Sequence, residues 1–308
     1  MRIAIFGCGA MGSIYAGLLA SAGHELIGID RNQAHVDAIN ASGLRVTGAS
    51  GDRCVAIQAY TEPPDIEVDL LVIAVKAAHV AASSTASSLV KSTGSILTIQ
   101  NGLGSADIVA GVFGIERLIV GVAQGFGASL QAPGISHHND MKAIRMGNYT
   151  QGNSQRLNDI VRIFKASGFD TEAVSNIEVV QWEKLICNVA YSGPCALTGL
   201  TVGEVLDDPI VGPVSRAAAI EAWEVARRRS IPIAVNDPVA YVQEFAERMR
   251  GAKPSVLLDI EAGRRSEIDV INGAVEREAM RVDAVAPVNA TITALVRSLE
   301  ERTIAKGH

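Results

Sequence analysis

A lysine, an asparagine and a serine lie at helical spacing in the second half of the chain. In the stretch Q-W-E-K-L-I-C-N-V-A-Y-S-G-P, Lys184, Asn188 and Ser192 follow one another at intervals of four residues, so on a helix they share one face. If that face is buried, desolvation lowers the pKa of the lysine and makes it a usable acid near neutral pH. The same spacing is also typical of an amphipathic helix whose lysine reaches out to water.

Polar residues also follow two apolar runs that have the character of buried strands. Asn101 comes directly after S-I-L-T-I-Q, and Lys76 comes directly after L-L-V-I-A-V. Ligands of open parallel sheets bind at the carboxyl ends of the strands, so both side chains are candidates for ligand contact. Taken singly, Asn101 before a glycine is typical of a turn, and Lys76 is typical of a solvated loop.

A third group of polar residues lies in P-S-V-L-L-D-I-E-A-G-R-R-S-E-I-D. It offers Ser255, Asp259 and Glu267, with Asn272 three residues beyond it, as candidates for binding or acid–base chemistry. Taken alone, Ser266 followed three residues later by Asp269 predicts a helix capping box, and Glu267 is then an acid of the first helical turn.

The N-terminal stretch R-I-A-I-F-G-C-G-A-M-G-S-I-Y-A-G-L-L-A-S-A-G is apolar, and a signal peptide or a membrane span would also fit its length. Five glycines interrupt it, and each costs a helix about 1 kcal/mol relative to alanine. Their spacing, Gly7-x-Gly9-x-x-Gly12 directly after a predicted strand, is the fingerprint of a dinucleotide-binding turn. We therefore predict a strand, a phosphate-binding turn and a helix.

Each residue of this fingerprint has a physical role. Gly7 permits the tight turn, Gly9 lets the backbone approach a pyrophosphate, and Gly12 allows the helix to pack against the strand. Ala10 and Met11 begin the helix, whose N-terminal amides would face the phosphate. A second strand, H-E-L-I-G-I-D, ends at Asp30, 18 residues after Gly12, where a carboxylate can accept hydrogen bonds from the ribose hydroxyls.

The order of predicted elements indicates two domains in the 308 residues. Up to about residue 175, strands alternate with helices, including helices over 33–41 and 77–90, short strands over 44–46 and 54–59, and an antiparallel pair on either side of A-P-G. This pattern predicts an α/β fold with a doubly wound, mainly parallel Rossmann sheet over 1–175. Beyond it, apolar spacing predicts an all-helical domain over 176–308, with helices over 179–191, 211–229, 238–250, 268–280 and 288–301.

Composition narrows the class of protein. The net charge of −6, with no basic stripe, argues against a nucleic-acid partner. The four cysteines contain no C-x-x-C and are typical of reduced, mostly buried thiols in a cytoplasmic protein. His137 and His138 are adjacent, so on a strand they point to opposite faces, and we predict no metal site there.

Together these motifs give a pattern that resembles the ketopantoate reductase (2-dehydropantoate 2-reductase) family. The elements that match are Gly7-x-Gly9-x-x-Gly12, V-K at 75–76, Q-N-G-L-G at 100–104, A-P-G-x-x-x-H at 132–138, W-E-K-L-x-x-N at 182–188, Ser255 with Asp259, and S-E-I-D-x-I-N-G at 266–273. They occur in family order over nearly the whole chain. Their combination is more specific than any one of them.

The resemblance implies the reduction of a 2-keto acid to a 2-hydroxy acid by hydride from a nicotinamide. It implies that Lys184 is the general acid that protonates the carbonyl oxygen, that Glu267 binds the substrate hydroxyl and helps to orient the lysine, and that Asn101 lies between nicotinamide and substrate. An ammonium at this place suits the chemistry, because negative charge develops on the carbonyl oxygen in the transition state.

The resemblance also implies binding roles. Asn188 and Ser255 would hold the polar ends of the substrate, and Lys76 would lie beside the cofactor. Where the family helix commonly continues to a second asparagine, this chain has Ser192. Because serine is shorter and lacks the amide donors, a pocket that includes Ser192 would suit a different 2-keto acid.

The choice between NADP and NAD depends on two neighbouring residues. Family members that use NADPH usually have a neutral residue followed by an arginine at the end of the second strand, whereas this chain has Asp30 followed by Arg31. The Asp30 carboxylate repels a 2′-phosphate and argues for NADH, while Arg31 attracts that phosphate and the family implies NADPH. Both cofactors stay open at this point.

We therefore predict a cytoplasmic NAD(P)-dependent oxidoreductase with ketopantoate, on the route to pantothenate and coenzyme A, as its leading substrate. An NADH-dependent D-2-hydroxy acid dehydrogenase for branched or aromatic 2-keto acids is the alternative that Asp30 and Ser192 keep open. A non-catalytic nucleotide sensor is a further alternative, but a sensor has no need of the proton donor Lys184. We predict no membrane span, and the C-terminal helices could pair in a homodimer or close the site of a monomer.

Overall fold

The computed structural model describes residues 1–125, 127–140 and 143–306. Within them the chain forms two compact units: an α/β unit of residues 1–100 and 105–177, and a helical unit of residues 101–104 and 178–308. The four-residue loop 101–104 thus belongs to the helical unit, although its neighbours in the sequence belong to the α/β unit. The assignment of 1–175 to cofactor binding and 176–308 to substrate binding stays a prediction.

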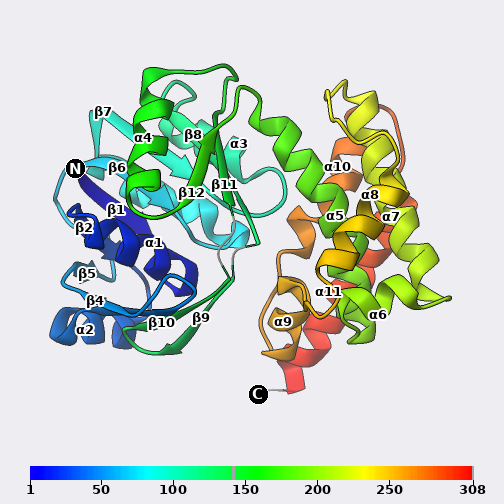
Figure 1. Cartoon of the computed structure of the whole chain (residues 1–308), viewed down its shortest axis with the longest axis horizontal. Helices are drawn as coiled ribbons and strands as arrows, with labels where there is room; N and C mark the ends of the chain where they lie inside the picture. Colours follow the sequence, from blue (N-terminus) through cyan, green and yellow to red (C-terminus); the bar gives the residue numbers. More distant parts are fainter. Residues whose placement is uncertain (126, 141–142, 307–308) are drawn as a thin grey trace. The chain divides into compact units, whose positions relative to one another are not determined.

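The α/β unit is built on a large, mainly parallel sheet (Figure 1). In spatial order its strands are β12 (Asp170–Ala173), β11 (Ala143–Asn148), β8 (Leu118–Gln124), β7 (Val90–Thr98), β6 (Val68–Ile73), β1 (Arg2–Phe6), β2 (Glu25–Ile29) and β5 (Gln58–Tyr60). All neighbours run parallel except β11 and β8. The predicted doubly wound sheet is confirmed.

Alternate residues of the central strands enter two different cores, as the two-residue period of a strand requires. On β1, Ile3 and Ile5 face one core, which also takes side chains from α1 (Ala10–Ser21), α2 (Gln33–Ser42) and α4 (Gln155–Ala166). Ala4 and Phe6 face the other, which is covered by α3 (Ser105–Phe113) and by a 3₁₀ segment over Ala77–Leu89. Because helices cover both faces, the central strands are apolar throughout.

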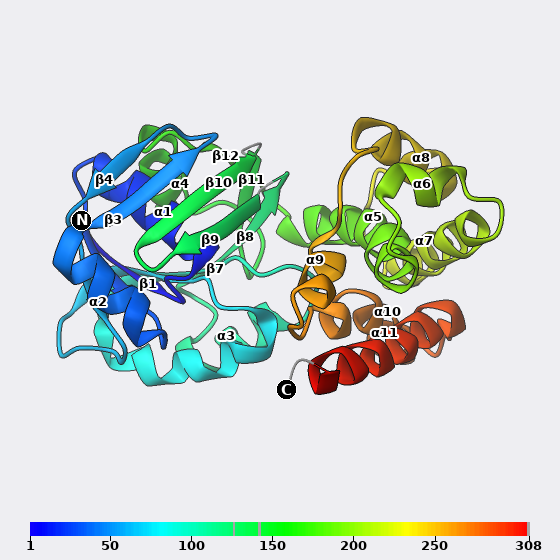
Figure 2. The ribbon, with the colours of Figure 1, turned by 90° about the horizontal axis from the view of Figure 1, so that it is seen from below.

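A second, smaller sheet packs on α1 (Figure 2). Its strands lie in the order β4 (Arg53–Val55), β3 (Leu44–Gly48), β10 (Ile135–Asp140) and β9 (Gly127–Ala132). The antiparallel pair predicted around A-P-G is confirmed as β9 and β10. The single strand predicted over 54–59 is wrong, because the chain leaves the small sheet after Val55 and enters the large one at Gln58.

The predicted all-helical second half is confirmed. Its helices are α5 (Ile177–Thr198), α6 (Val202–Asp207), α7 (Val211–Arg228), α8 (Pro238–Arg248), α9 (Ser255–Glu261), α10 (Asn272–Met280) and α11 (Pro287–Lys306). One continuous apolar core holds them together, with α5 contributing Trp182, Leu185, Ile186 and Val189 among others.

Two predicted helices differ from the structure. The segment 77–90 forms 3₁₀ turns rather than an α-helix, in a stretch rich in serine and alanine that carries few large apolar side chains. The helix predicted over 268–280 breaks at Ile271, where φ is −101° and ψ is −93°. A 3₁₀ turn over Ile268–Val270 precedes the break, and this turn is part of the candidate site.

Three of the four cysteines are buried, as the composition predicts: Cys8, Cys187 and Cys195. Desolvation raises the pKa of each of these thiols to about 12. Cys54 is exposed, and its Sγ donates to the carbonyl oxygen of Ser42 at 3.4 Å. Among the described residues, no helix has both the length and the apolar character needed to cross a bilayer.

Candidate active site

The turn between β1 and α1 has the backbone of a dinucleotide-binding turn. Gly7 has a φ of +94°, and a Cβ on Gly12 would lie 2.1 Å from the carbonyl oxygen of Gly7. A Cβ on Gly9 would meet only Asp30 Oδ2, at 3.5 Å, so this position has room for a ligand. The first intrahelical hydrogen bond runs from Ser13 N–H to Gly9 O, which leaves the preceding amides for an anion. These residues fit a pyrophosphate.

Asp30 lies at the end of β2, beside this turn. Its Oδ1 accepts the N–H of Asn32 at 2.9 Å, and its Oδ2 faces Gly9. Arg31, the next residue, is exposed. The carboxylate therefore lies beside the dinucleotide-binding turn, and the exposed guanidinium of Arg31 lies one residue further along.

In the helical unit, three side chains separated widely in the sequence form one hydrogen-bonded chain. Lys184 Nζ donates to Asn101 Oδ1 at 2.7 Å, and Asn101 Nδ2 donates to Glu267 Oε2 at 3.1 Å. The Asn101 amide thus joins an ammonium on α5 to a carboxylate in the turn before α10. The interpretation of Lys184 as a solvated lysine is therefore wrong. Asn101 does lie in a turn before Gly102, as predicted, and its side chain makes these two contacts in addition.

Burial changes the proton affinity of the lysine. Desolvation lowers the pKa of Lys184 to about 8, and the negative charge of Glu267 opposes that shift. A large fraction of the lysine is therefore protonated near neutral pH, yet the proton is held far less tightly than on a solvated lysine. This is the proton affinity that a general acid needs.

The direction of Lys184 is set by how α5 packs. Its neighbours Leu185, Ile186 and Val189 are fully buried in the core. One turn beyond, the carbonyl oxygen of Val189 accepts a hydrogen bond from Asn272 Nδ2 at 3.1 Å. These contacts fix the rotation of α5 about its axis, and so they fix the face on which Lys184 stands.

Asn101 is held through the backbone of its loop. Gly102 has a φ of +73°, and a Cβ there would lie 1.9 Å from the carbonyl oxygen of Val270. That same oxygen accepts the N–H of Leu103 at 2.9 Å. Arg277 connects the two segments, since its Nη1 donates to Asp269 O at 2.6 Å and its Nη2 donates to Leu103 O at 3.5 Å. The loop is therefore docked on the 3₁₀ turn that follows Glu267, a role of Val270 and Arg277 that the sequence pattern does not reveal.

The backbone beside Glu267 is fixed from α11. Glu300, which is 5% exposed, accepts hydrogen bonds from the N–H and the Oγ of Ser266. The predicted capping box from Ser266 to Asp269 is wrong, because Ser266 Oγ bonds to Glu300 and to Ile268 N–H and no α-helix begins there. Glu300 lies far from the site in sequence, and no local motif marks it.

The other predicted residues lie in varied environments. Asn188 is half-buried, one turn beyond Lys184 on α5, and its side chain makes no hydrogen bond with any described residue. Ser192 follows on the same face and is 4% exposed.

Ser255 is exposed at the first residue of α9, whereas Asp259 on the same helix pairs with Arg264 at 3.0 Å. Lys76, in the α/β unit, is exposed after β6.

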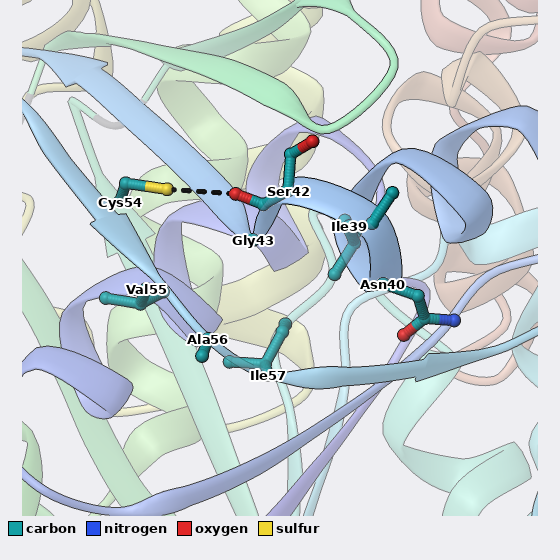
Figure 3. A pocket seen from close by; sticks show the side chains of 9 residues that line it. Ile39, Asn40, Ser42, Gly43, Cys54, Val55, Ala56 and Ile57 are labelled. Carbon is teal, nitrogen blue, oxygen red and sulfur yellow. Dashed lines mark hydrogen bonds between the residues drawn. The ribbon is translucent and has the colours of Figure 1, made fainter.

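A separate pocket of about 400 Å³ lies in the α/β unit between the end of α2 and the segment that joins β4 to β5 (Figure 3). Two of its polar side chains are engaged with the protein: the Asn40 amide pairs with the backbone of Ala59, and Cys54 Sγ donates to Ser42 O. None of the predicted site residues lines this pocket.

The two adjacent histidines lie on β10. His137 Nδ1 is 3.0 Å from Thr47 Oγ1, and His138 is buried. Over the part of the chain that the structure describes, no three histidine, cysteine or acidic side chains come together as a metal site would require.

Comparison with known proteins extends these observations. The model of the family "Ketopantoate reductase PanE/ApbA" matches residues 3–151, and that of its C-terminal part matches residues 176–300. A 2-dehydropantoate 2-reductase of Pyrococcus abyssi is 31% identical over 97% of this chain and 98% of the relative. The chain belongs to the ketopantoate reductase family.

Solved structures of similar proteins have the same fold. A PanE/ApbA family ketopantoate reductase from Ralstonia eutropha JMP134 is similar with a TM-score of 0.90 and 30% identity, over 98% of this chain and 99% of that one. D-mandelate dehydrogenase, solved with NADH and anilino(oxo)acetate, is similar with a TM-score of 0.89 and 25% identity, over 98% of this chain and 99% of that one. The protein is accordingly an oxidoreductase that acts on CH–OH groups.

Substituting Gly102 by alanine tests the docking of the Asn101 loop. The new methyl group would collide with Val270 O, so the loop must move and Asn101 must leave its position between Lys184 and Glu267. We expect Gly102→Ala to lower kcat for reduction of a 2-keto acid by roughly 10- to 100-fold, with dinucleotide affinity unchanged.

The matched control is Gly111→Ala on α3, where an added Cβ meets nothing within 4 Å. It should keep full turnover. Wild-type turnover in Gly102→Ala, measured from the absorbance of the reduced nicotinamide, would show that the loop docking does not position Asn101.

Proposed function

We propose that this protein reduces 2-dehydropantoate (ketopantoate) to pantoate with a reduced nicotinamide dinucleotide, a step toward pantothenate and coenzyme A. The observation that carries the proposal is the hydrogen-bonded chain Lys184–Asn101–Glu267, with a lysine whose pKa is about 8. The names of the relatives support the substrate. A purely nucleotide-sensing protein would have no use for such an acid.

The dinucleotide, when bound, supplies a hydride to C2 of the keto acid. As the carbonyl π bond breaks, negative charge develops on the carbonyl oxygen, and the Lys184 ammonium stabilises it and transfers one proton to it. The product is the 2-hydroxy acid, and the neutral lysine regains a proton from water. Asn101 holds the ammonium from one side, and Glu267 is proposed to bind the substrate hydroxyl and to keep the lysine charged.

Three further side chains are proposed to bind the substrate. Asn188 has an amide with no hydrogen-bond partner among the described residues and stands one turn from Lys184. Ser192 follows on the same helix face, and Ser255 is exposed on α9. Their hydroxyl and amide groups suit the polar ends of a keto acid that carries a carboxylate and a hydroxyl.

For the cofactor we propose a preference for NADH over NADPH. The amides at the start of α1 would hold the pyrophosphate, with Lys76 beside the cofactor, and the Asp30 carboxylate would accept the ribose hydroxyls. A 2′-phosphate placed there would be repelled by Asp30, which already lies beside Gly9. Arg31 would attract a 2′-phosphate, but it is exposed, so solvent screens its charge.

A second substrate class has an observation of its own in its favour. Ser192 replaces the asparagine common in the family, and D-mandelate dehydrogenase is among the similar structures.

A panel of ketopantoate with branched and aromatic 2-keto acids, tested with NADH and NADPH, separates the two substrate classes. Fast turnover of ketopantoate would support the proposal. Turnover of aromatic or branched 2-keto acids alone would show that the protein belongs to the second substrate class. The predicted cytoplasmic location and homodimer stay predictions.

Replacing Lys184 tests the general acid. Lys184→Ala should lower kcat by roughly 10² or more. In the wild type, kcat/KM for reduction should be constant at lower pH and should fall as the pH rises through about 8, because only the protonated lysine donates. For the reverse oxidation the sign is inverted, since the neutral lysine must accept the proton, and the rate should rise through the same range.

Lys184→Arg is the matched variant, because it keeps the positive charge but holds its proton too tightly to donate it. It should bind the keto acid, remain slow and lose the pH dependence. Near-normal turnover in Lys184→Ala, with the wild-type pH profile retained, would remove Lys184 from the mechanism.

Replacing Asp30 tests the cofactor preference. Asp30→Asn removes the charge and retains an acceptor for Asn32 N–H, so the local turn is kept. We expect the ratio of kcat/KM for NADPH to that for NADH to rise about tenfold, which corresponds to about 1.4 kcal/mol. Arg31→Ala is the comparison and should lower that ratio. An unchanged ratio in Asp30→Asn would refute the role of the carboxylate.

A further inference from the structure

His35, the third residue of α2, is fully buried beneath the dinucleotide-binding turn. Its Nδ1 accepts the backbone N–H of Gly134 at 2.9 Å, and its Nε2 lies 2.9 Å from the carbonyl oxygen of Cys8 and 3.3 Å from Ser13 Oγ. An amide N–H can only donate and a carbonyl can only accept, so Nδ1 is unprotonated and Nε2 carries the ring proton. The contacts with Gly134 and Cys8 fix both the tautomer and the ring orientation.

The carbonyl oxygen of Cys8 is held by two donors. Besides His35, the buried Ser13 Oγ donates to it at 3.0 Å. These two bonds occupy both lone pairs of the oxygen. In a planar trans peptide the C=O of Cys8 and the N–H of Gly9 point in opposite directions. Holding the Cys8 carbonyl toward α2 therefore turns the Gly9 N–H away from the protein interior.

Without these donors, the Cys8–Gly9 peptide would be held only from its two ends, where Cys8 N–H donates to Ile29 O and Gly9 O accepts Ser13 N–H. Gly9 has no side chain, and a Cβ at its position would meet only Asp30 within 4 Å. Because glycine is conformationally permissive, the plane of such a peptide can still rotate between these two anchors, and ordering it on binding costs conformational entropy. The side chains of His35 and Ser13 remove that freedom before a ligand arrives.

The other end of this contact explains the A-P-G motif. Gly134 follows Pro133 in the turn between β9 and β10, and its N–H is the group that His35 Nδ1 accepts. Two residues on, Ser136 Oγ donates to the carbonyl oxygen of Ala10 at 2.8 Å, in the first turn of α1. The β9–β10 hairpin therefore contacts the dinucleotide-binding turn directly at Ala10 and through His35 at Cys8.

We propose that His35 is a positioning residue for the cofactor: its Nε2–H fixes the Cys8–Gly9 peptide so that the Gly9 amide faces a phosphate of the dinucleotide, and the β9–β10 turn fixes His35. The inference rests on the proposed binding of a nicotinamide dinucleotide. It assigns the A-P-G turn to cofactor affinity rather than to the keto acid.

Two conservative variants separate the contacts of Nδ1 from those of Nε2. The terminal amide of glutamine reaches the position of Nε2, so His35→Gln can still donate to Cys8 O while it loses Gly134. The shorter amide of asparagine reaches the position of Nδ1, so His35→Asn can still accept from Gly134 while it loses Cys8 O. Each variant loses one buried hydrogen bond, so both should be destabilised to a similar extent.

The measurement is the equilibrium Kd for NADH and NADPH, by titration of nicotinamide fluorescence, together with Tm and kcat. We expect His35→Asn to raise the Kd of the preferred cofactor about tenfold and His35→Gln to change it about twofold or less, with similar Tm values. At saturating cofactor, kcat should stay near that of the wild type, since the Lys184 site is untouched. Equal Kd values in the two variants would overturn the proposal.

Ser13→Ala provides a test that does not depend on the histidine variants being folded. It removes the second donor to Cys8 O and should raise Kd severalfold, whereas Ser21→Ala should not, because on the same helix it loses only a bond to Gly17 O. An unchanged Kd in Ser13→Ala would also overturn the proposal. If the wild type itself binds neither dinucleotide, the proposed function fails instead.

Discussion

The side-chain amide of Asn101 is the interaction on which the candidate site depends. An amide carries an acceptor oxygen and a donor nitrogen on the same planar group. The oxygen of Asn101 accepts from the Lys184 ammonium, and its nitrogen donates to the Glu267 carboxylate. Neither charged residue needs to move for both bonds to form. The position of Asn101 in turn depends on Gly102, whose backbone lies against Val270 O with no room for a side chain.

Burial and charge act in opposite directions on the lysine, and burial has the larger effect. Desolvation lowers the pKa of Lys184, Glu267 partly restores it, and the result is about 8. Coulombic attraction would dominate if the two groups were close and well desolvated together. A carboxylate bonded to the Asn101 amide supplies enough attraction to keep the lysine charged near neutral pH. The proton is nevertheless labile enough to be transferred.

Much of the fold was predictable because its signals are local. The two-residue period of the strands, the glycine fingerprint and the 3.6-residue period of the helices gave the sheet, the turn and the helical half. The break at Ile271 and the hydrogen bonds from Ser266 to Glu300 were not predictable, because they depend on contacts between segments distant in sequence. For the site, Lys184 and Asn101 were favoured over their ordinary interpretations only by the family resemblance. Local spacing alone did not distinguish them.

The dinucleotide-binding turn and the loop that carries Asn101 are held in place in the same way. Each has a glycine where backbone must adopt a left-handed conformation or approach a ligand, and such a residue is intrinsically mobile. In each, a hydrogen bond to a neighbouring backbone group removes that mobility: Leu103 N–H is accepted by Val270 O, and Cys8 O is held by His35 and Ser13. The glycines are the residues by which the sequence motifs are recognised. The residues that restrain them lie outside those motifs. A substitution at a restraining partner can therefore disturb function while it leaves every motif residue intact.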